Sequence, residues 1–484
     1  MTAIDAKVRR RQETASRLRL FRRLANGLAA AAVIGATPFA WPAESPSETA
    51  QPAIKQPLEV PDTKGAFLGY RTAIQIGLEQ HPQLQRSEQR AKGAEAIAEQ
   101  ARSRYYPELN AYAIQTGGTA RPSSAFNIAG SQNKPTSYVE SAGVRADQLL
   151  YDFGQTAHKI LAEEAGREAA GQDIHTHKAL VILRVQQAYI HCLRQKRLVD
   201  IAEETVRERG LLRDQIAILY RRELKSKLDL DLIAIELRNA EVQLLQARNE
   251  RRAAFASLNN AMGVQGPEEY TLEDVSLPDS GADSLETLIT QALEERPEVR
   301  GATDRIRQAA EQFRSAEAMN RPTVSAQGMY GVIHFSDAPL NQYAGAHVGQ
   351  TNLWWGVGAT LSVPIFTGFL IENRVAEARA QRYKREYTKS DLTNRITLEM
   401  TDAYLSLQTA RQQIRVEEQE VASARSALTL AKERYRLGLA SIVDITTATT
   451  ALLMAEVRLS EARYAVQTSI AVVGYARGKT YQEF

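Results

Sequence analysis

The stretch from Ile396 to Val473 is the feature of the sequence that most restricts the fold. Its apolar residues recur at alternating spacings of three and four, first up to Tyr435 and then, after a turn at Gly438, again from Ile445 onwards. This spacing is the seam of a coiled coil, in which two helices pack along their whole length. The sequence therefore predicts two very long helices that form an antiparallel hairpin.

The same hairpin occurs earlier in the chain, because residues that are 215 positions apart match along much of the sequence. The matched positions include Pro82 and Pro297, Pro107 and Pro322, Tyr220 and Tyr435, Asp229 and Asp444, and Gly263 and Gly478. So many matches at one constant offset indicate two tandem copies of one unit of roughly 200 residues.

Residues 1–43 are typical of a secretory signal peptide. Eight basic residues precede an apolar run from Leu24 to Ala36, which is shorter than the ~20 residues of a membrane-spanning helix. An uncleaved membrane anchor is the alternative interpretation. The basic and acidic residues of this segment sum to +6, so the remainder of the chain falls from the total of +3 to −3. The basic character therefore belongs to the signal, and we expect no nucleic-acid partner.

Residues 44–66 are rich in proline, serine, glutamate and glutamine, which is typical of a flexible leader. The only cysteine, Cys192, lies inside a predicted helix. A single cysteine excludes an internal disulfide, and its position excludes an acylated cysteine at a mature amino terminus. We expect Cys192 to be a small packed residue.

Each copy begins with a helix that one proline interrupts and a second proline closes. The first copy covers residues 67–266, a linker covers 267–283, and the second copy covers 284–478. The interruptions fall at His81-Pro82 and Arg296-Pro297. Long helices are predicted at 155–220 and 369–436, each ~100 Å in length. Return helices are predicted at 228–262 and 441–475.

A period of two between these helices predicts a β-hairpin in each copy, at about 108–151 and 323–366. In the last strand the residues that share one face are Trp355, Val357, Ala359, Leu361, Val363 and Ile365. Strands of this length with one apolar face suit a transmembrane β-barrel, but four strands are too few to close one. The hairpins are therefore a soluble sheet, or several chains contribute to one barrel. The signal peptide and the aromatic residues Tyr138, Tyr343, Trp354 and Trp355 near the loop ends favour the membrane.

Motifs of enzymes are absent from the sequence. It contains no GxxxxGK[ST], HExxH or GxSxG pattern. His175 and His177 are two residues apart on a helix and point in different directions, so we do not expect them to share a metal ion. The two glycines of Gly356-Val357-Gly358 lie inside a strand, where they suit a crowded barrel wall rather than a phosphate loop. We expect no catalytic residue, no metal ion and no cofactor.

The order of these elements resembles the TolC family of outer-membrane channel proteins, over about residues 67 to 478. The most specific match is the turn from Tyr435 to Asp444, which is similar to the family's Tyr-x-x-Gly-x-x-x-x-x-Asp turn at the periplasmic tip. The resemblance implies a mostly α-helical protein with membrane β-hairpins. It also implies a homotrimer, in which a twelve-strand β-barrel in the outer membrane continues as a twelve-helix α-barrel that extends far into the periplasm.

The resemblance further implies a gate at the periplasmic tip. Asp444 is then the aspartate of a ring of three carboxylates that attracts cations. The other candidate entrance residues are Tyr435, Gly438, Asp229 and Tyr220. Thr447 and Ala440 replace a second aspartate and a basic residue of the family, which predicts a weaker ring and a looser closed state. Glu223 replaces the turn glycine in the first copy, so we expect Asp229 to be less securely placed. The alternative for both aspartates is a solvated or helix-capping residue.

The function implied by this resemblance is a passive outer-membrane exit duct of a tripartite efflux pump or a type I secretion system. Its partners are then a periplasmic adaptor, an inner-membrane transporter, outer-membrane lipid and two further copies of the chain. The competing class is a periplasmic coiled-coil structural or adaptor protein. An adaptor has one helical hairpin with soluble β modules, whereas this sequence predicts two hairpins, each with membrane-type strands.

Overall fold

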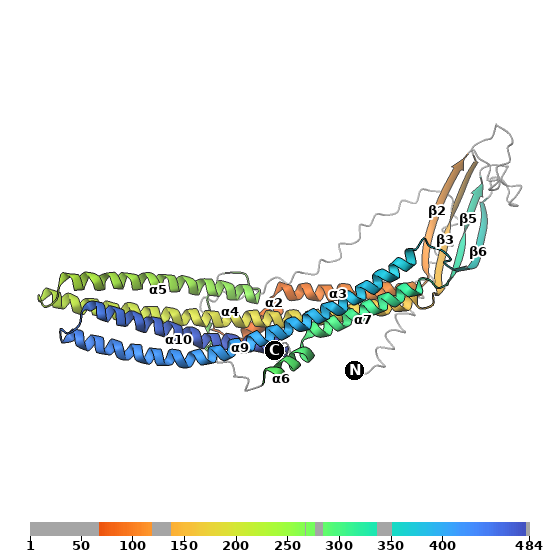
Figure 1. The fold of residues 1–484 in the computed structure, drawn as a ribbon. Helices are drawn as coiled ribbons and strands as arrows, with labels where there is room; N and C mark the ends of the chain where they lie inside the picture. Colours follow the sequence, from red (N-terminus) through yellow and green to blue (C-terminus); the bar gives the residue numbers. More distant parts are fainter. Residues whose placement is uncertain (1–66, 119–136, 267, 276–283, 336–350, 481–484) are drawn as a thin grey trace, which may run out of the picture. The chain divides into compact units, whose positions relative to one another are not determined.

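The computed structural model describes residues 67–118, 137–266, 268–275, 284–335 and 351–480 (Figure 1). The expected signal peptide and leader, Tyr343 and most of the linker lie outside these residues. So do the side chain of Tyr138 and the loops at the tips of both predicted β-hairpins.

The described chain is mostly helical, and its helices and longer strands recur 215 positions later. The first half contains β1 (Phe67–Leu68), α2 (Tyr70–Gln80), α3 (Pro82–Arg102), a 3₁₀ turn (Ser103–Tyr105), β2 (Glu108–Gly118), β3 (Ser137–Tyr151), α4 (Gln155–Arg221), α5 (Lys227–Met262) and β4 (Thr271–Leu272). The second half contains α6 (Leu285–Glu295), α7 (Pro297–Ala318), β5 (Thr323–Phe335), β6 (Thr351–Ser362), α9 (Leu370–Arg436) and α10 (Ile442–Arg477).

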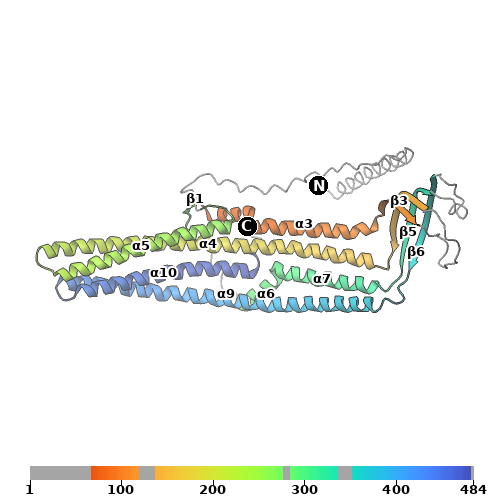
Figure 2. The ribbon, with the colours of Figure 1, turned by 90° about the horizontal axis from the view of Figure 1, so that it is seen from above.

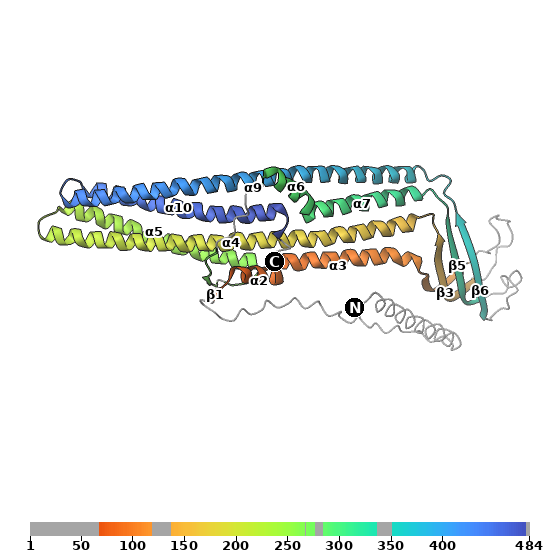
Figure 3. The same cartoon turned by 90° about the horizontal axis from the view of Figure 1, so that it is seen from below.

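Two helices of 67 residues, α4 and α9, run the length of the helical layer. Helices α3 and α5 lie end to end along α4, and α7 and α10 lie end to end along α9 (Figures 1 and 3). Helix α4 also packs against α7 and α10, so the four rows of helices lie side by side. Among the described residues, no helix is apolar over a stretch long enough to cross a membrane.

The end-to-end arrangement depends on a glycine at the end of each return helix. Gly263 and Gly478 follow α5 and α10 in the left-handed conformation, with φ of +77° and +85°. A Cβ atom at Gly263 would lie 2.8 Å from His81 Cα, and one at Gly478 would lie 2.9 Å from the backbone nitrogen of Arg296. Only glycine tolerates both the φ angle and the close approach. Each glycine thus allows one helix to end against the start of the next.

The predicted seam of the second hairpin is buried. Nine of its residues on α9 are buried, namely Ile396, Met400, Ala403, Leu407, Ala410, Val421, Ala424, Leu428 and Tyr435. Its counterpart on α10 includes the buried residues Ile445, Ala455, Ala462 and Val473. The spacing of three and four places these residues on one stripe of each helix, and the two stripes face each other.

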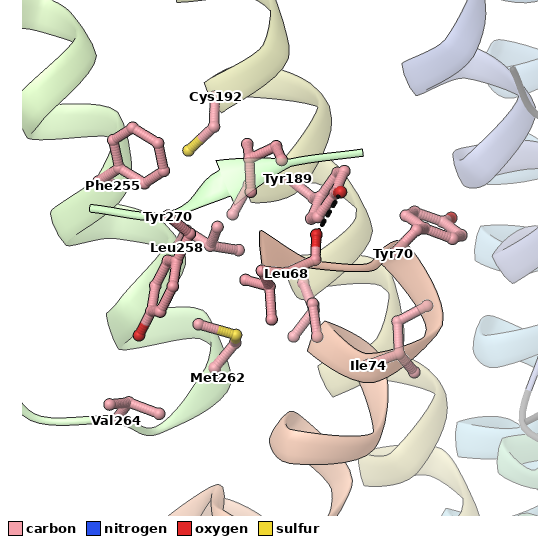
Figure 4. Close-up of a cluster of buried hydrophobic side chains, with 14 of the residues drawn as sticks. Leu68, Tyr70, Ile74, Tyr189, Cys192, Phe255, Leu258, Met262, Val264 and Tyr270 are labelled. Atoms are coloured by element: carbon pink, nitrogen blue, oxygen red, sulfur yellow. Dashed lines mark hydrogen bonds between the residues drawn. The ribbon is translucent and has the colours of Figure 1, made fainter. Parts of the chain in front are cut away.

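A second core holds the start of the described chain against α4 and α5 (Figure 4). β1 pairs in parallel with β4, and the fully buried Tyr189 donates its hydroxyl to the carbonyl oxygens of Leu68 (2.9 Å) and Glu273 (3.0 Å). Cys192 is also fully buried here, and burial raises the pKa of its thiol to about 12. It is the small packed residue that the sequence predicted.

The four long strands form one antiparallel sheet in the order β2-β3-β5-β6. Gly143 and Gly331 face each other between β3 and β5, where a Cβ on Gly143 would lie 2.5 Å from the carbonyl oxygen of Tyr330. The last strand ends at Ser362, before the predicted Ile365. Pro364 explains this difference, because proline has no N–H for a strand hydrogen bond.

Candidate functional site

The candidate entrance residues lie around two turns, which we call the tip. The first turn (222–226) joins α4 to α5, and the second (437–441) joins α9 to α10. Both turns lie at the same end of the helical layer, away from the strands (Figure 2). Because α4 and α9 each begin close after a strand, the tip lies ~100 Å from the sheet.

Both long helices end in the same hydrogen-bonded turn. A backbone N–H donates to the carbonyl five residues earlier, from Leu224 to Leu219 at 2.9 Å and from Leu439 to Arg434 at 2.8 Å. The residue inside each turn, Glu223 or Gly438, is left-handed, with φ of +62° and +75°. Glycine adopts this conformation freely, whereas a residue with a Cβ loses about 1 kcal/mol.

Each return helix begins with a capping box, in which a serine and an aspartate satisfy each other's backbone N–H groups. The backbone N–H of Ser441 donates to Asp444 Oδ2 at 2.7 Å, and that of Ser226 donates to Asp229 Oδ2 at 3.2 Å. Both return helices thus begin in the same way, and the placement of Asp229 at an entrance stays a prediction. Glu223 adopts the glycine conformation, so both aspartates occupy the same position.

Asp444 combines a local structural contact with an exposed position. Both hydrogen bonds that its carboxylate accepts from Ser441 use Oδ2. These bonds, first from the backbone and then from the hydroxyl of Ser441, lower the pKa of the Asp444 carboxyl. The side chain therefore stays ionised near neutral pH, and it is exposed at the start of α10.

Tyr435 lies at the centre of the tip, in an apolar cluster that both hairpins share. The other buried members are Ile216, Ile233, Leu428, Ile442 and Ile445. Lys225, from the opposite turn, places its Nζ 3.7 Å from the centre of the Tyr435 ring, a cation–π contact. Burial, with a smaller effect from the charge of Asp229, raises the pKa of Tyr435 to about 12. The structure thus brings Tyr435 and the first turn together, whereas Tyr220, at the matching position, is 39% exposed and outside the cluster.

Arg209 is a tip residue that the sequence interpretation missed. Its side chain is 5% exposed, and Nη1 donates to the backbone carbonyl of Glu236 (2.9 Å) and lies 2.9 Å from the Glu236 carboxylate. Its Nη2 donates to Thr450 Oγ1 on α10 at 3.4 Å. The sequence could have identified Arg209, because the residue 215 positions later is the seam residue Ala424, so Arg209 itself falls at a seam position. A charge at a seam position requires a specific partner.

An open cleft of about 780 Å³ separates the two hairpins at the tip. Arg209 and Lys225 line it from the first hairpin, and Tyr435 and Gly438 from the second. The two hairpins are therefore joined here by the apolar cluster and by contacts that cross from one hairpin to the other, Lys225 to Tyr435 and Arg209 to Thr450.

The histidine pair of the sequence analysis lies far from the tip, on α4. His177 Nδ1 is 3.3 Å from the side-chain nitrogen of Gln83. Within the described ranges, no group of three histidine, cysteine or acidic side chains is placed to hold a metal ion.

The fold thus combines an antiparallel β-sheet with a long helical layer that ends in two matching turns. The chain matches the outer membrane efflux protein family over residues 73–264 and 288–473. It therefore belongs to that family, whose members are outer-membrane channels, and its location is the outer membrane.

Among its relatives is the outer membrane protein TolC of Escherichia coli (strain K12), 24% identical over 403 residues, which cover 79% of this chain and 77% of TolC. The cation efflux system protein CusC of the same organism is 24% identical over 375 residues, 75% of this chain and 76% of CusC. The fold is similar to the crystal structure of VceC from Vibrio cholerae, with a TM-score of 0.71, 20% identity and coverage of 84% of this chain and 96% of VceC.

Proposed function

We propose that the protein is the passive outer-membrane exit duct of a tripartite efflux pump or of a type I secretion system. The observation that carries this proposal is the continuity of strand and helix, since a 67-residue helix follows each β-hairpin. The sheet carries exposed apolar side chains that suit a lipid environment, including Trp355, Val357 and Leu361. The helices then extend into the periplasm.

The two unpaired edges of the β-sheet support assembly into a homotrimer. In the described sheet, β2 and β6 each have one unpaired edge, and such edges require a partner. β2 follows α3 along the chain and β6 precedes α9. A ring of head-to-tail copies therefore pairs β6 of one chain with β2 of the next, and α9 of one chain with α3 and α5 of the next. Three chains, each built from two copies of one unit, form a twelve-strand β-barrel that continues as a twelve-helix α-barrel.

The work of transport falls to partners in this proposal. An inner-membrane transporter supplies the energy, and a periplasmic adaptor docks on the helical tip. The relatives TolC and CusC support an efflux or secretion role, and CusC is by its name part of a cation efflux system.

The gate in this proposal is the tip. The contacts of Lys225 with Tyr435 and of Arg209 with Thr450 hold the two hairpins together in the closed state. Asp444 contributes one carboxylate per chain, so a trimer carries three at one constriction. Like charges at this constriction attract cations and repel anions.

Single-channel conductance in a planar bilayer tests both parts of the proposal. The mature protein is compared with Asp444→Asn, which removes the charge, and with Ser441→Ala, which removes the cap but keeps the charge. We expect a small cation-selective conductance whose selectivity decreases in Asp444→Asn and persists in Ser441→Ala.

The outcomes separate the two parts. Equal loss of selectivity in both variants assigns the effect to the cap and removes Asp444 from the gate, while the duct remains. No conductance from trimeric, folded protein contradicts the duct itself and favours the periplasmic coiled-coil alternative.

A further inference from the structure

The chain contains two equivalent joints, where a return helix ends against the start of a shorter helix. The first joint lies between α5 and α3, where Gly263 contacts His81. The second lies between α10 and α7, where Gly478 contacts Arg296. Gly263 and Gly478 are 215 positions apart, and so are His81 and Arg296. The two joints can therefore be compared residue by residue.

The second joint neutralises its own charge. Arg296 is 2% exposed, and its Nη1 donates to Glu399 Oε2 at 2.8 Å. Its Nε lies 3.9 Å from the Glu298 carboxylate, and its guanidinium lies 5.1 Å from the centre of the Tyr475 ring. A buried guanidinium with carboxylate and aromatic partners meets the requirement for a charge removed from water.

The first joint has lost every one of these acids. The equivalents of Arg296, Glu298, Glu399 and Tyr475 are His81, Gln83, Arg184 and Asn260. The change from Glu399 to Arg184 reverses the charge, and the carboxylate of Glu298 becomes the neutral amide of Gln83. No ion pair of Arg184 occurs in the described part of the chain, where its Nη1 donates to the amide oxygen of Gln83 at 2.9 Å.

An open pocket of about 720 Å³ occupies the first joint. It is lined by polar residues just before α3 and on α4 and α5, which include His81, Arg184, Gln187, His191, Ser257 and Asn260. None of these is acidic, so the pocket presents cationic and neutral groups alone.

The hydrogen bonds of the two histidines favour an anion over a metal ion. His81 Nδ1 accepts from the backbone N–H of Gln83 at 3.1 Å, and His191 Nδ1 lies 3.2 Å from Arg194 Nη2. A neutral ring whose Nδ1 accepts carries its proton on Nε2, which is then a donor. Burial, with the nearby charges of Arg184 and Arg194, lowers the pKa of His81 and of His191 respectively. Glu250 has a smaller, opposite effect on the pKa of His191.

We propose that the first joint binds a small carboxylate anion from outside the chain, which supplies the acidic group that Glu399 supplies in the second joint. Arg184 is the principal partner, because its planar guanidinium matches a carboxylate in two parallel hydrogen bonds. His81 and His191 add donors. The bound anion joins α3, α4 and α5 as Glu399 joins α7 and α9.

Isothermal titration calorimetry of the full-length protein in detergent tests this proposal without any measurement of transport. Succinate is titrated at constant ionic strength, with chloride as the reference anion and inorganic phosphate as a second probe. We expect one saturable succinate site per chain and at least tenfold weaker binding in Arg184→Gln. In Arg184→Glu, which restores the acid of the second joint, we expect no binding.

A matched control is Arg395→Gln, which removes an exposed arginine of α9 near the second joint and leaves the pocket unchanged. We expect it to bind succinate as the unmodified protein does. The absence of saturable succinate binding, or equal binding by Arg184→Gln and Arg395→Gln, overturns the proposal. Tighter binding of phosphate than of succinate overturns the assignment of a carboxylate.

Discussion

The buried arginine of the tip allows a prediction in which two substitutions of one ion pair have different effects. Glu236→Ala removes the carboxylate and leaves the Arg209 guanidinium, which is 5% exposed, with the Glu236 carbonyl and Thr450 alone. Arg209→Met removes the charge itself and places an apolar side chain at a seam position. The counterpart at that position in the second hairpin is the apolar Ala424.

The magnitudes follow from the exposure of the two partners. Removal of one partner of a fully buried ion pair costs about 3–5 kcal/mol. Here the backbone carbonyl of Glu236 still accepts from Arg209, so we expect about 2–3 kcal/mol for Glu236→Ala. In Arg209→Met the remaining carboxylate is 29% exposed and can return to water. No buried charge is stranded, and we expect a loss below about 1.5 kcal/mol.

Hydrogen–deuterium exchange of the trimer measures this difference where it arises. Peptides that cover residues 205–213 and 446–452 report the local opening of α4 and α10. A cost of 2–3 kcal/mol increases their exchange rate by roughly 30- to 140-fold. Arg238→Ala, which removes an exposed ion pair of α5, is the control and leaves the rate unchanged. If Arg209→Met increases exchange as much as Glu236→Ala does, the stranded charge is not the cause.

Three further predictions concern the turns and the core. Gly438→Ala destabilises the second turn by about 1 kcal/mol, whereas Glu223→Gly stabilises the first by a similar amount, since both positions are left-handed. Amide exchange at the two turns should therefore change in opposite directions, and a change in the same direction contradicts this reasoning. The folded pKa of Asp444 is lowered, so its contribution to the start of α10 is complete above the unfolded pKa of about 3.9 and is lost as pH falls through the lower folded pKa. If protection from amide exchange at this turn is unchanged by acid, or is already lost near pH 6, the carboxylate of Asp444 does not stabilise the start of α10. Tyr189→Phe removes the hydroxyl whose one proton is shared between the carbonyls of Leu68 and Glu273. We expect it to destabilise β1 by about 1–3 kcal/mol and so to increase amide exchange there, whereas Tyr404→Phe, the matching change in the second half, leaves β1 unaffected.

The long hairpins were predictable because their cause is local. A stripe of apolar residues at spacings of three and four identifies a helix and its buried face without knowledge of any distant contact. The seam from Ile396 to Tyr435 is buried accordingly. The ends of α3 and α7 followed from Pro107 and Pro322 for the same reason, since proline acts on its own stretch of backbone.

The turn of the first hairpin shows where a local rule fails. Glu223 stands where the second turn has a glycine, yet the residue is left-handed and Asp229 forms the same capping box as Asp444. The capping box and the packing of Ile216 and Ile233 stabilise the turn by more than the roughly 1 kcal/mol that a left-handed glutamate costs. Tertiary contacts therefore decided the conformation of this residue.

By itself, the sequence determined the helices, their seams, the two turns and the offset of 215 that relates the halves of the chain. The tertiary structure alone decided which polar residues meet. Arg209 and Thr450 are 241 positions apart, and Arg184 and His81 are 103 apart, yet each pair lines one site. Periodicity specifies which face of a helix is buried, but not the rotation and level at which two distant helices meet. The contact of Arg209 with Thr450 and the pocket at the first joint both depend on how these distant helices are placed against each other.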